Sequence, residues 1–197
     1  MSHLSNRRSF IGGSDARLIM GDDEAKLVRL WREKRGEVEP EDLSDVLIVQ
    51  LGSVTEDLNR RWYERNSGCA VKGVQKHIRH PVIKWMAATL DGLVEPSGAV
   101  FEAKFMLPWT FSEEAAAAKH MAQLQHNMWV ADARSAVLSI VTGGGKWVEM
   151  TIHADPGPVA GLVGIEGGVV SGVFNLESSG VEASDWRPRH DEQYHEA

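Results

Sequence analysis

The sequence predicts a single α/β domain with a mixed central β-sheet flanked by α-helices. Helical periodicity appears in two long stretches, over about 44–66 and 112–131. Runs of β-branched and apolar residues, separated by turn signals, lie between and after these helices, over about 70–105 and 135–152. A chain of 197 residues with 43% hydrophobic residues is sufficient to bury one sizeable core.

The composition narrows the class of protein. Cys69 is the single cysteine, so no internal disulfide can form, which fits a reducing cytoplasm. No run of about 18 apolar residues is present, so we expect no membrane span, and residues 1–8 lack the apolar stretch of a signal peptide. The formal net charge of −7 argues against a nucleic-acid-binding protein, unless basic side chains gather locally and the acidic ones lie elsewhere.

Two helices are expected near the N-terminus. Residues 11–15 (Ile-Gly-Gly-Ser-Asp) place two glycines before a short helix that has Ser14 or Asp15 as its N-cap and ends at Gly21. Free N–H groups at such a start form an ordinary cap or bind an anion, and the local pattern favours the cap. The second helix is expected over about 24–35.

The long helix over about 44–66 is expected to bury an apolar stripe against the sheet. Its large apolar residues recur at steps of four, three, four and four, as a buried helix face requires. These residues are Leu47, Leu51, Val54, Leu58 and Trp62. Glu56 falls outside the stripe, and periodicity alone predicts that its side chain is solvated.

The segment 89–104 carries the densest functional signal. Asp91 precedes a turn signal, and the residues after this turn are expected to form a strand. On that strand Glu102 and Lys104 share one face, and apolar residues occupy the other. If the segment 83–90 pairs with this strand as a hairpin, Asp91 and Glu102 converge. Two carboxylates beside an ammonium suit a divalent cation and metal-assisted phosphodiester hydrolysis.

The helix over about 112–131 is expected to have a buried face and a polar face beside it. Ser112 is its predicted N-cap. The predicted buried stripe is Ala117, Met121, Leu124 and Met128, and the neighbouring face, which could line a site, is Ala116, His120, Gln123 and Asn127. By itself, Gln123 is more typical of a surface glutamine than of a site residue. Strands over 135–142 and 147–152, joined by a glycine-rich hairpin turn, complete the predicted sheet.

Five motifs in this order resemble a known family. They are residues 11–15, 51–56 (Leu-Gly-Ser-Val-Thr-Glu), 89–92 (Thr-Leu-Asp-Gly), 101–104 (Phe-Glu-Ala-Lys) and 121–130 (Met-Ala-Gln-Leu-Gln-His-Asn-Met-Trp-Val). Together they resemble the phage-type exonucleases, the lambda exonuclease or YqaJ-like viral recombinase group of the PD-(D/E)xK nucleases. The resemblance runs from about residue 7 to residue 152. It implies one restriction-endonuclease-like nuclease domain over 1–197, with a core over about 7–153 and a glycine-rich C-terminal extension over about 154–197.

The resemblance also implies a metal site. Asp91, Glu102 and the carbonyl of Ala103 would bind Mg²⁺, for which Mn²⁺ would substitute, and Glu56 would complete the site towards a second metal. Lys104 would orient or deprotonate the attacking water and stabilise the developing charge.

A second implied feature is a pocket for a 5′-phosphate at a DNA end. Arg7 and Ser14 match the residues of this pocket in the family, and Thr89 supplies a hydroxyl to it. Gln123 would position the phosphate or the attacking water, as part of the catalytic set. The chain departs from the family pattern at His120, where a tyrosine is common, and at Leu90, where the motif that names the superfamily has proline.

The expected function is a Mg²⁺-dependent 5′→3′ exonuclease that acts on double-stranded DNA ends in phage-type recombination. Relatives form a ring-shaped homotrimer and work with a single-strand annealing protein, in the cytoplasm of the bacterial host of a phage or prophage. A ring with an acidic exterior and a basic channel would agree with the net charge.

Two alternatives stay open. A structure- or site-specific endonuclease could have the same core without the end-binding pocket, so Arg7 and Ser14 distinguish it. A catalytically silent DNA-end-binding module is disfavoured by the intact set of Asp91, Glu102 and Lys104.

Overall fold

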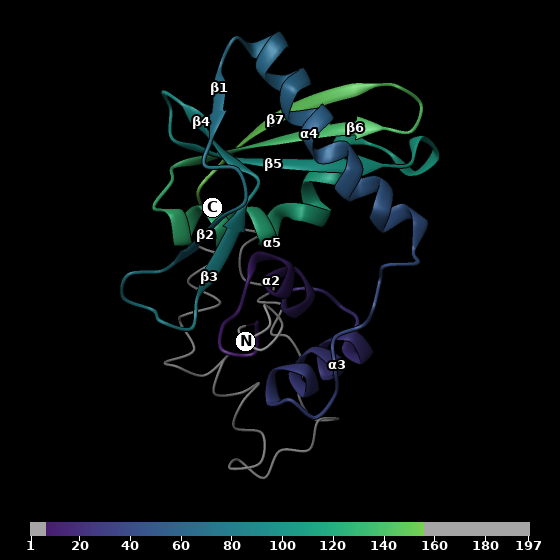
Figure 1. Cartoon of the computed structure of the whole chain (residues 1–197), viewed down its shortest axis with the longest axis vertical. Coiled ribbons are helices and arrows are strands. Elements are labelled where there is room, and N and C mark those ends of the chain that lie inside the picture. Colours follow the sequence, from purple (N-terminus) through teal and green to yellow (C-terminus); the bar gives the residue numbers. More distant parts are fainter. Residues whose placement is uncertain (1–6, 156–197) are drawn as a thin grey trace, which may run out of the picture.

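The computed structural model describes residues 7–155 and shows the predicted α/β fold with a mixed central sheet (Figure 1). The strands are β1 (Ala70–Lys72), β2 (Lys76–Arg79), β3 (Ala87–Leu90), β4 (Gly92–Glu95), β5 (Ala99–Met106), β6 (Ser135–Thr142) and β7 (Trp147–His153). Five of them form the central sheet in the order β1-β4-β5-β6-β7, and β2 and β3 form a two-stranded sheet. Only the β5–β6 pair of the central sheet is parallel.

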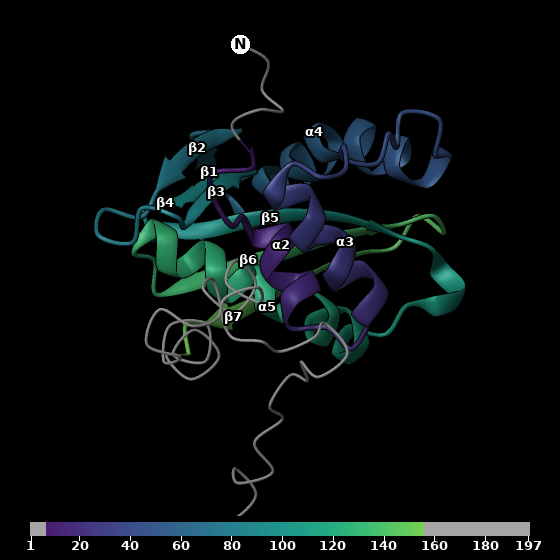
Figure 2. The same ribbon diagram turned by 90° about the horizontal axis from the view of Figure 1, so that it is seen from below.

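The helices are α2 (Gly13–Ile19), α3 (Glu24–Arg35), α4 (Leu47–Ser67) and α5 (Glu113–Ala131), with a short 3-10 turn, η1, at Pro108–Thr110. Viewed along the sheet, α4 lies above β5 and α5 lies below it, so the two long helices cover opposite faces (Figure 2). Parallel neighbouring strands need a crossover connection, and α5 is the helix of the connection from β5 to β6. It begins, as predicted, with the Ser112 side chain accepting the N–H of Ala115.

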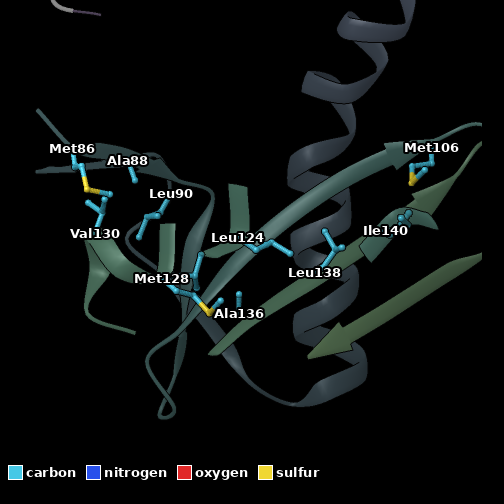
Figure 3. Close-up of a cluster of buried hydrophobic side chains, with 12 residues drawn as sticks. Met86, Ala88, Leu90, Met106, Leu124, Met128, Val130, Ala136, Leu138 and Ile140 are labelled. Atoms are coloured by element: carbon cyan, nitrogen blue, oxygen red, sulfur yellow. The ribbon is translucent and has the colours of Figure 1, made fainter. Parts of the chain in front are cut away.

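The main apolar core lies between α5 and the strands. Figure 3 shows side chains from α5, β3 and β6 gathered in this layer. Its buried members are Met86, Ala88, Leu90, Val100, Met106, Ala116, Leu124, Met128, Val130, Ala136, Leu138 and Ile140. Leu124 and Met128 are fully buried, whereas Ala117 and Met121, the other half of the predicted stripe, are only partly buried.

A second core lies on the α4 side of the same sheet. The rings of Tyr63 on α4 and Phe101 on β5 are 5.1 Å apart between centroids, and Ala103 packs in the same cluster. Val100 belongs to the core on the opposite face. The alternation of β5 side chains between the two faces therefore agrees with its prediction as a strand.

The N-terminal segment is fixed by a buried ion pair. Lys34 on α3 and Asp15 on α2 are both buried, and Lys34 Nζ lies 2.6 Å from Asp15 Oδ2. The same ammonium donates to the carbonyl oxygens of Arg7 at 2.8 Å and Phe10 at 2.7 Å. Lys34 thus satisfies its three donors internally and ties the chain before α2 to α3.

The predicted buried stripe of α4 is wrong. The exposed fractions are 71% for Leu47, 75% for Val54 and 55% for Leu58, and Leu51 and Trp62 are exposed as well. Asn59 and Tyr63 are the buried residues of this helix. The helix therefore turns its other face, which also carries Glu56, towards the sheet.

Asn59 gives the physical reason for this orientation. Its Nδ2 donates to the carbonyl oxygens of Ser139 at 2.8 Å and Lys104 at 3.2 Å, and its Oδ1 accepts the Ser139 hydroxyl at 2.6 Å. These bonds join α4 to β5 and β6 at once. Buried amides need such partners, so the polar face of α4 is the face that contacts the sheet.

Two further predictions are corrected at the level of local structure. The N-cap of α2 is Gly12, and the Asp15 side chain accepts the Gly12 N–H at 2.8 Å, so neither Ser14 nor Asp15 is the cap residue. The partner of β5 in the hairpin is β4, whereas the end of the predicted segment 83–90 forms β3, which pairs with β2. Of the predicted C-terminal extension, residues 156–197 lie outside the described residues.

Within residues 7–155, no helix is long and apolar enough to cross a membrane.

The contacts of Asn59 predict a large loss of stability for Asn59→Ala. This substitution removes the three hydrogen bonds that join α4 to β5 and β6 and takes away the acceptor of the buried Ser139 hydroxyl, so we expect the free energy of unfolding to fall by about 2–3 kcal/mol. Urea denaturation measures the change. The matched control is Asn66→Ala, because exposed Asn66 bonds only to a carbonyl of its own helix, and this variant should stay within about 0.5 kcal/mol of the parent. Equal losses in the two variants would contradict this role of Asn59.

Candidate active site

The predicted acidic residues converge at the junction of the two sheets. Gly92 of β4 pairs with Phe101 of β5, and one more step along this antiparallel register brings Asp91 opposite Glu102. Asp91 Oδ2 accepts the backbone N–H of Ala103 at 2.9 Å. The carboxylate of Asp91 therefore bonds the strand that carries Glu102.

Glu102 is the centre of the site. Its exposed fraction is 2%, and its two carboxylate oxygens accept bonds from three side chains. Oε1 accepts from Lys104 Nζ at 2.5 Å and from Gln123 Nε2 at 2.6 Å, and Oε2 accepts from Asn127 Nδ2 at 3.1 Å. Gln123 and Asn127 both belong to the polar face of α5, so this face lies against Glu102.

Glu56 reaches the site through Gln75, a residue that the sequence analysis did not single out. Gln75 Nε2 donates to Glu56 Oε2 at 3.2 Å and to Asp91 Oδ1 at 3.4 Å. Gln75 lies in the turn between β1 and β2 with φ of 55°, in the left-handed region that non-glycine residues seldom adopt. Nothing in the residue type indicates this turn, so the sequence offered no signal for Gln75.

Burial shifts the pKa of each of the three acids upwards. For Glu102 burial raises the pKa to about 7, the nearby charge of Asp91 adds to the effect, and Lys104 opposes it. Burial also raises the pKa of Asp91, again against Lys104. The pKa of Glu56 is raised by burial and by the charge of Asp91. Loss of contact with water is thus the main cause of all three shifts, and repulsion between the acids adds to it at Glu102 and Glu56.

The pKa of Lys104 is also raised, but by the neighbouring charges and not by burial. Burial alone would lower the pKa of Lys104, but the charges of Glu102 and Asp91 outweigh burial and raise it. Lys104 is therefore an ammonium at neutral pH, in contact with Glu102. His120 is also close enough for the Lys104 charge to act on it, and burial together with that charge lowers the pKa of His120 to about 3. The residue that replaces the family tyrosine is thus a neutral imidazole.

The carboxylates of Glu56, Asp91 and Glu102 are the acidic groups that could bind a divalent cation here. With the side chains as they stand, no three or more His, Cys, Asp or Glu residues within 7–155 are grouped closely enough to hold an ion. Glu102 is turned to its three donors, and the Gln75 amide donates to both Glu56 and Asp91. Nevertheless, carboxylate oxygens are the hard donors that Mg²⁺ prefers. The residues fit such a cation: among the described side chains, Glu102 Oε2 accepts only the bond from Asn127 and keeps a lone pair for it, whereas Gln75 would have to give up its bonds to Glu56 and Asp91.

The residues of the predicted 5′-phosphate pocket are engaged separately. Arg7 Nη2 lies 3.5 Å from Asp15 Oδ1, and Arg7 remains about half exposed. The Thr89 hydroxyl lies 3.2 Å from Nδ1 of His77 on the neighbouring strand. Ser14 is exposed in the first turn of α2. The Gly12 N–H, at the start of α2, is bonded to the Asp15 side chain.

The fold matches those of solved exonucleases. An alkaline exonuclease (LHK-Exo) from Laribacter hongkongensis superimposes with a TM-score of 0.69 at 19% identity, over 89% of this chain and 92% of that chain. A phage-related exonuclease from Haemophilus somnus 129PT matches with a TM-score of 0.55 at 15% identity, over 79% of this chain and 85% of that one. The chain therefore has the α/β fold of the alkaline exonucleases.

The sequence matches a family directly. The profile of the YqaJ-like viral recombinase domain matches residues 2–134. The protein YqaJ of Bacillus subtilis (strain 168) is 31% identical over 158 residues, which are 77% of this chain and 49% of that protein. The chain belongs to the YqaJ-like viral recombinase domain family, as the sequence motifs predicted, and it spans about half the length of this relative.

The raised pKa of Glu102 predicts a pH-dependent affinity for Mn²⁺. A carboxyl group must lose its proton to bind a cation, so affinity should rise about tenfold per pH unit up to about pH 7 and then level off. Isothermal titration calorimetry between pH 5.5 and 8.5 measures this profile. Glu102→Gln should weaken binding and reduce the dependence to what Asp91 and Glu56 contribute, whereas Glu149→Gln, on β7, should retain the parental profile. An affinity that stays constant across this range would exclude Glu102 as a ligand.

Proposed function

We propose that this protein is a divalent-metal-dependent deoxyribonuclease that degrades double-stranded DNA from its ends in the 5′→3′ direction, in phage-type recombination. The observation that carries the proposal is the convergence of Asp91, Glu102 and Lys104, with Gln123 bonded to the same carboxylate. Membership of the viral recombinase family and the alkaline exonuclease fold support the same function.

In the proposed site, Asp91, Glu102 and the carbonyl of Ala103 hold Mg²⁺ or Mn²⁺, and Glu56 extends the site towards a second ion. A bound divalent cation activates water and polarises the scissile phosphate. The oxygen of the water forms a bond to phosphorus, the bond from phosphorus to the 3′ oxygen breaks, and that oxygen takes up a proton. Gln123, on α5, would orient the phosphate or the water.

Lys104 has a role that depends on the charge around it. With free carboxylates nearby, its raised pKa keeps it an ammonium, which stabilises negative charge on the phosphate. When the carboxylate charge is compensated, burial acts on Lys104 with less opposition and lowers its pKa. The same side chain can then accept the proton of the attacking water and pass it on.

Specificity for DNA ends would come from a pocket for the 5′-phosphate. Arg7, with about half of its side chain exposed, supplies positive charge, and exposed Ser14 and Thr89 supply hydroxyl groups. Gln123 would face the same phosphate from α5. This pocket is what separates an exonuclease from an endonuclease built on the same core.

The proposed biological setting follows from the family. We expect a ring-shaped homotrimer, a single-strand annealing protein as partner, and action in the cytoplasm of the bacterial host. A ring that faces DNA with its basic side chains and solvent with its acidic ones supports duplex binding despite the net charge of −7.

The proposed activity is tested with three DNA substrates in the presence and absence of Mg²⁺: linear 5′-phosphorylated duplex, linear 5′-hydroxyl duplex and closed circular duplex. Only the linear molecules should be degraded, and only with metal. Lys104→Ala should reduce turnover by at least about 10²-fold, because it removes charge stabilisation and the proton acceptor, while duplex binding in Ca²⁺ is retained. Lys146→Ala, an exposed lysine on the β6–β7 turn, is the control. Cleavage of the circle would support an endonuclease instead, and no product from any substrate would refute both nuclease functions.

The proposed end pocket makes a separate prediction. Arg7→Ala should reduce the ratio of turnover on 5′-phosphorylated duplex to turnover on 5′-hydroxyl duplex by about tenfold, because a charge-assisted hydrogen bond to phosphate is lost. The matched control is Arg8→Ala, because Arg8 is ion-paired with Glu39 and should not change the ratio. If both variants keep the parental ratio, Arg7 does not read the 5′-phosphate.

A further inference from the structure

Asn127 is the least accessible of the three donors to Glu102. Its exposed fraction is 1%, and its Nδ2 donates to Glu102 Oε2 at 3.1 Å. Among the residues that the structure describes, Asn127 Oδ1 has no hydrogen-bond partner. Such a buried unpaired acceptor costs about 1–3 kcal/mol. The opposite amide orientation would place this oxygen against the Glu102 carboxylate, so the bond to Glu102 decides which way the amide faces.

The oxygen of Asn127 lies against the first residue of α2. A Cβ atom on Gly13 would stand 2.3 Å from Asn127 Oδ1 and 3.0 Å from Gln123 Cγ. The first of these distances is far below van der Waals contact. Gly13 is not among the glycines with positive φ, so space rather than backbone conformation requires glycine here.

Gly12 is different, although it is adjacent. A Cβ on Gly12 would meet its nearest neighbours, Asp15 Oδ2 and a Phe10 ring carbon, at 3.6 Å, which is ordinary contact. Its φ of −101° is accessible to alanine. The two glycines of the same motif therefore have separable roles.

The segment before Gly13 cannot readily move away from Asn127. The Asp15 side chain accepts the Gly12 N–H, and Lys34 bonds both Asp15 and the carbonyl of Phe10. These bonds hold the start of α2 in place. The Asn127 amide therefore lies between the start of α2 and the carboxylate of Glu102.

We propose that Asn127 is a positioning residue. Its amide packs against Gly13 and hydrogen-bonds Glu102, and it thereby couples the position of the start of α2 to that of the proposed metal-binding carboxylate. The inference rests on the proposed role of Glu102 as a metal ligand. A side chain at Gly13 would push the amide into Glu102, and loss of the amide would free the carboxylate to turn further towards Lys104 and Gln123. Both changes weaken cation binding, and they act through one contact.

The test measures Mn²⁺ binding to the full chain without DNA, by isothermal titration calorimetry at pH 8. Asn127→Ala and Gly13→Ala should each raise the Mn²⁺ dissociation constant by about 10–100-fold, as is usual when a group that orients a metal ligand is lost. Gly12→Ala should stay within about twofold. Gln125→Ala is the second control, because Gln125 is a buried amide of α5 that bonds the His153 carbonyl and not Glu102.

The decisive variant is Gly13→Ala combined with Asn127→Ala. Without the amide, the methyl group added at Gly13 meets no oxygen. The dissociation constant of the double variant for Mn²⁺ should therefore lie within about threefold of that of Asn127→Ala alone. Independent effects would instead multiply the two single increases. Thermal unfolding without metal establishes that each variant is folded. If Gly13→Ala does not fold, the comparison of Asn127→Ala with Gln125→Ala decides.

Three results would overturn the proposal: multiplicative effects in the double variant, equal losses in Gly12→Ala and Gly13→Ala, or equal Mn²⁺ binding by Asn127→Ala and Gln125→Ala. Failure of the proposed function is distinct, because it appears in the parent protein. A parent that binds no Mn²⁺ removes the metal site and this coupling together. If the parent protein binds Mn²⁺ and Asn127→Ala binds it with the same affinity, only the proposed coupling is refuted.

Discussion

The buried carboxylate of Glu102 is the constraint on which the site depends. An ionised carboxylate removed from water is costly unless it is paired and hydrogen-bonded. Here the compensation comes from Lys104 on the same strand and from two amides on α5. The helix must therefore cross β5 at the level of residue 102, with its polar face inward at this point and its apolar face on the core around Leu138. One charged group thus fixes how α5 is seated on the sheet.

Much of the fold could be predicted because it depends on local signals. Asp23 and Gly36 bound α3, Ser112 caps α5, and the alternation on β5 assigns Phe101 and Glu102 to opposite faces. The convergence of Asp91 with Glu102 was also predictable, because two residues that flank a tight hairpin at equal distance must meet. The predicted strand was nevertheless misplaced: β4 forms the hairpin, and Asp91 lies just before it.

The remaining features depend on contacts between distant parts of the chain. The apolar spacing of α4 correctly indicates a helix with an apolar side, but it does not say which side meets the sheet. That choice follows from Asn59, whose partners Lys104 and Ser139 are 45 and 80 residues away. Gln75 and Lys34 were missed for the same reason. Each owes its role to neighbours that only the folded chain brings together, and neither residue type is unusual at its position.

The buried pair of Lys34 and Asp15 has a consequence for how the N-terminal region can vary. Loss of either partner leaves one charge buried without compensation, whereas an apolar pair of similar volume can fill the same space at little cost. A single change at either position should therefore cost more stability than a joint change to an apolar pair. Lys34 also bonds the carbonyl oxygens of Arg7 and Phe10, so a joint change would release the segment that carries Arg7. Sequence change in α3 is in this way tied to the position of Arg7, a residue of the proposed end pocket.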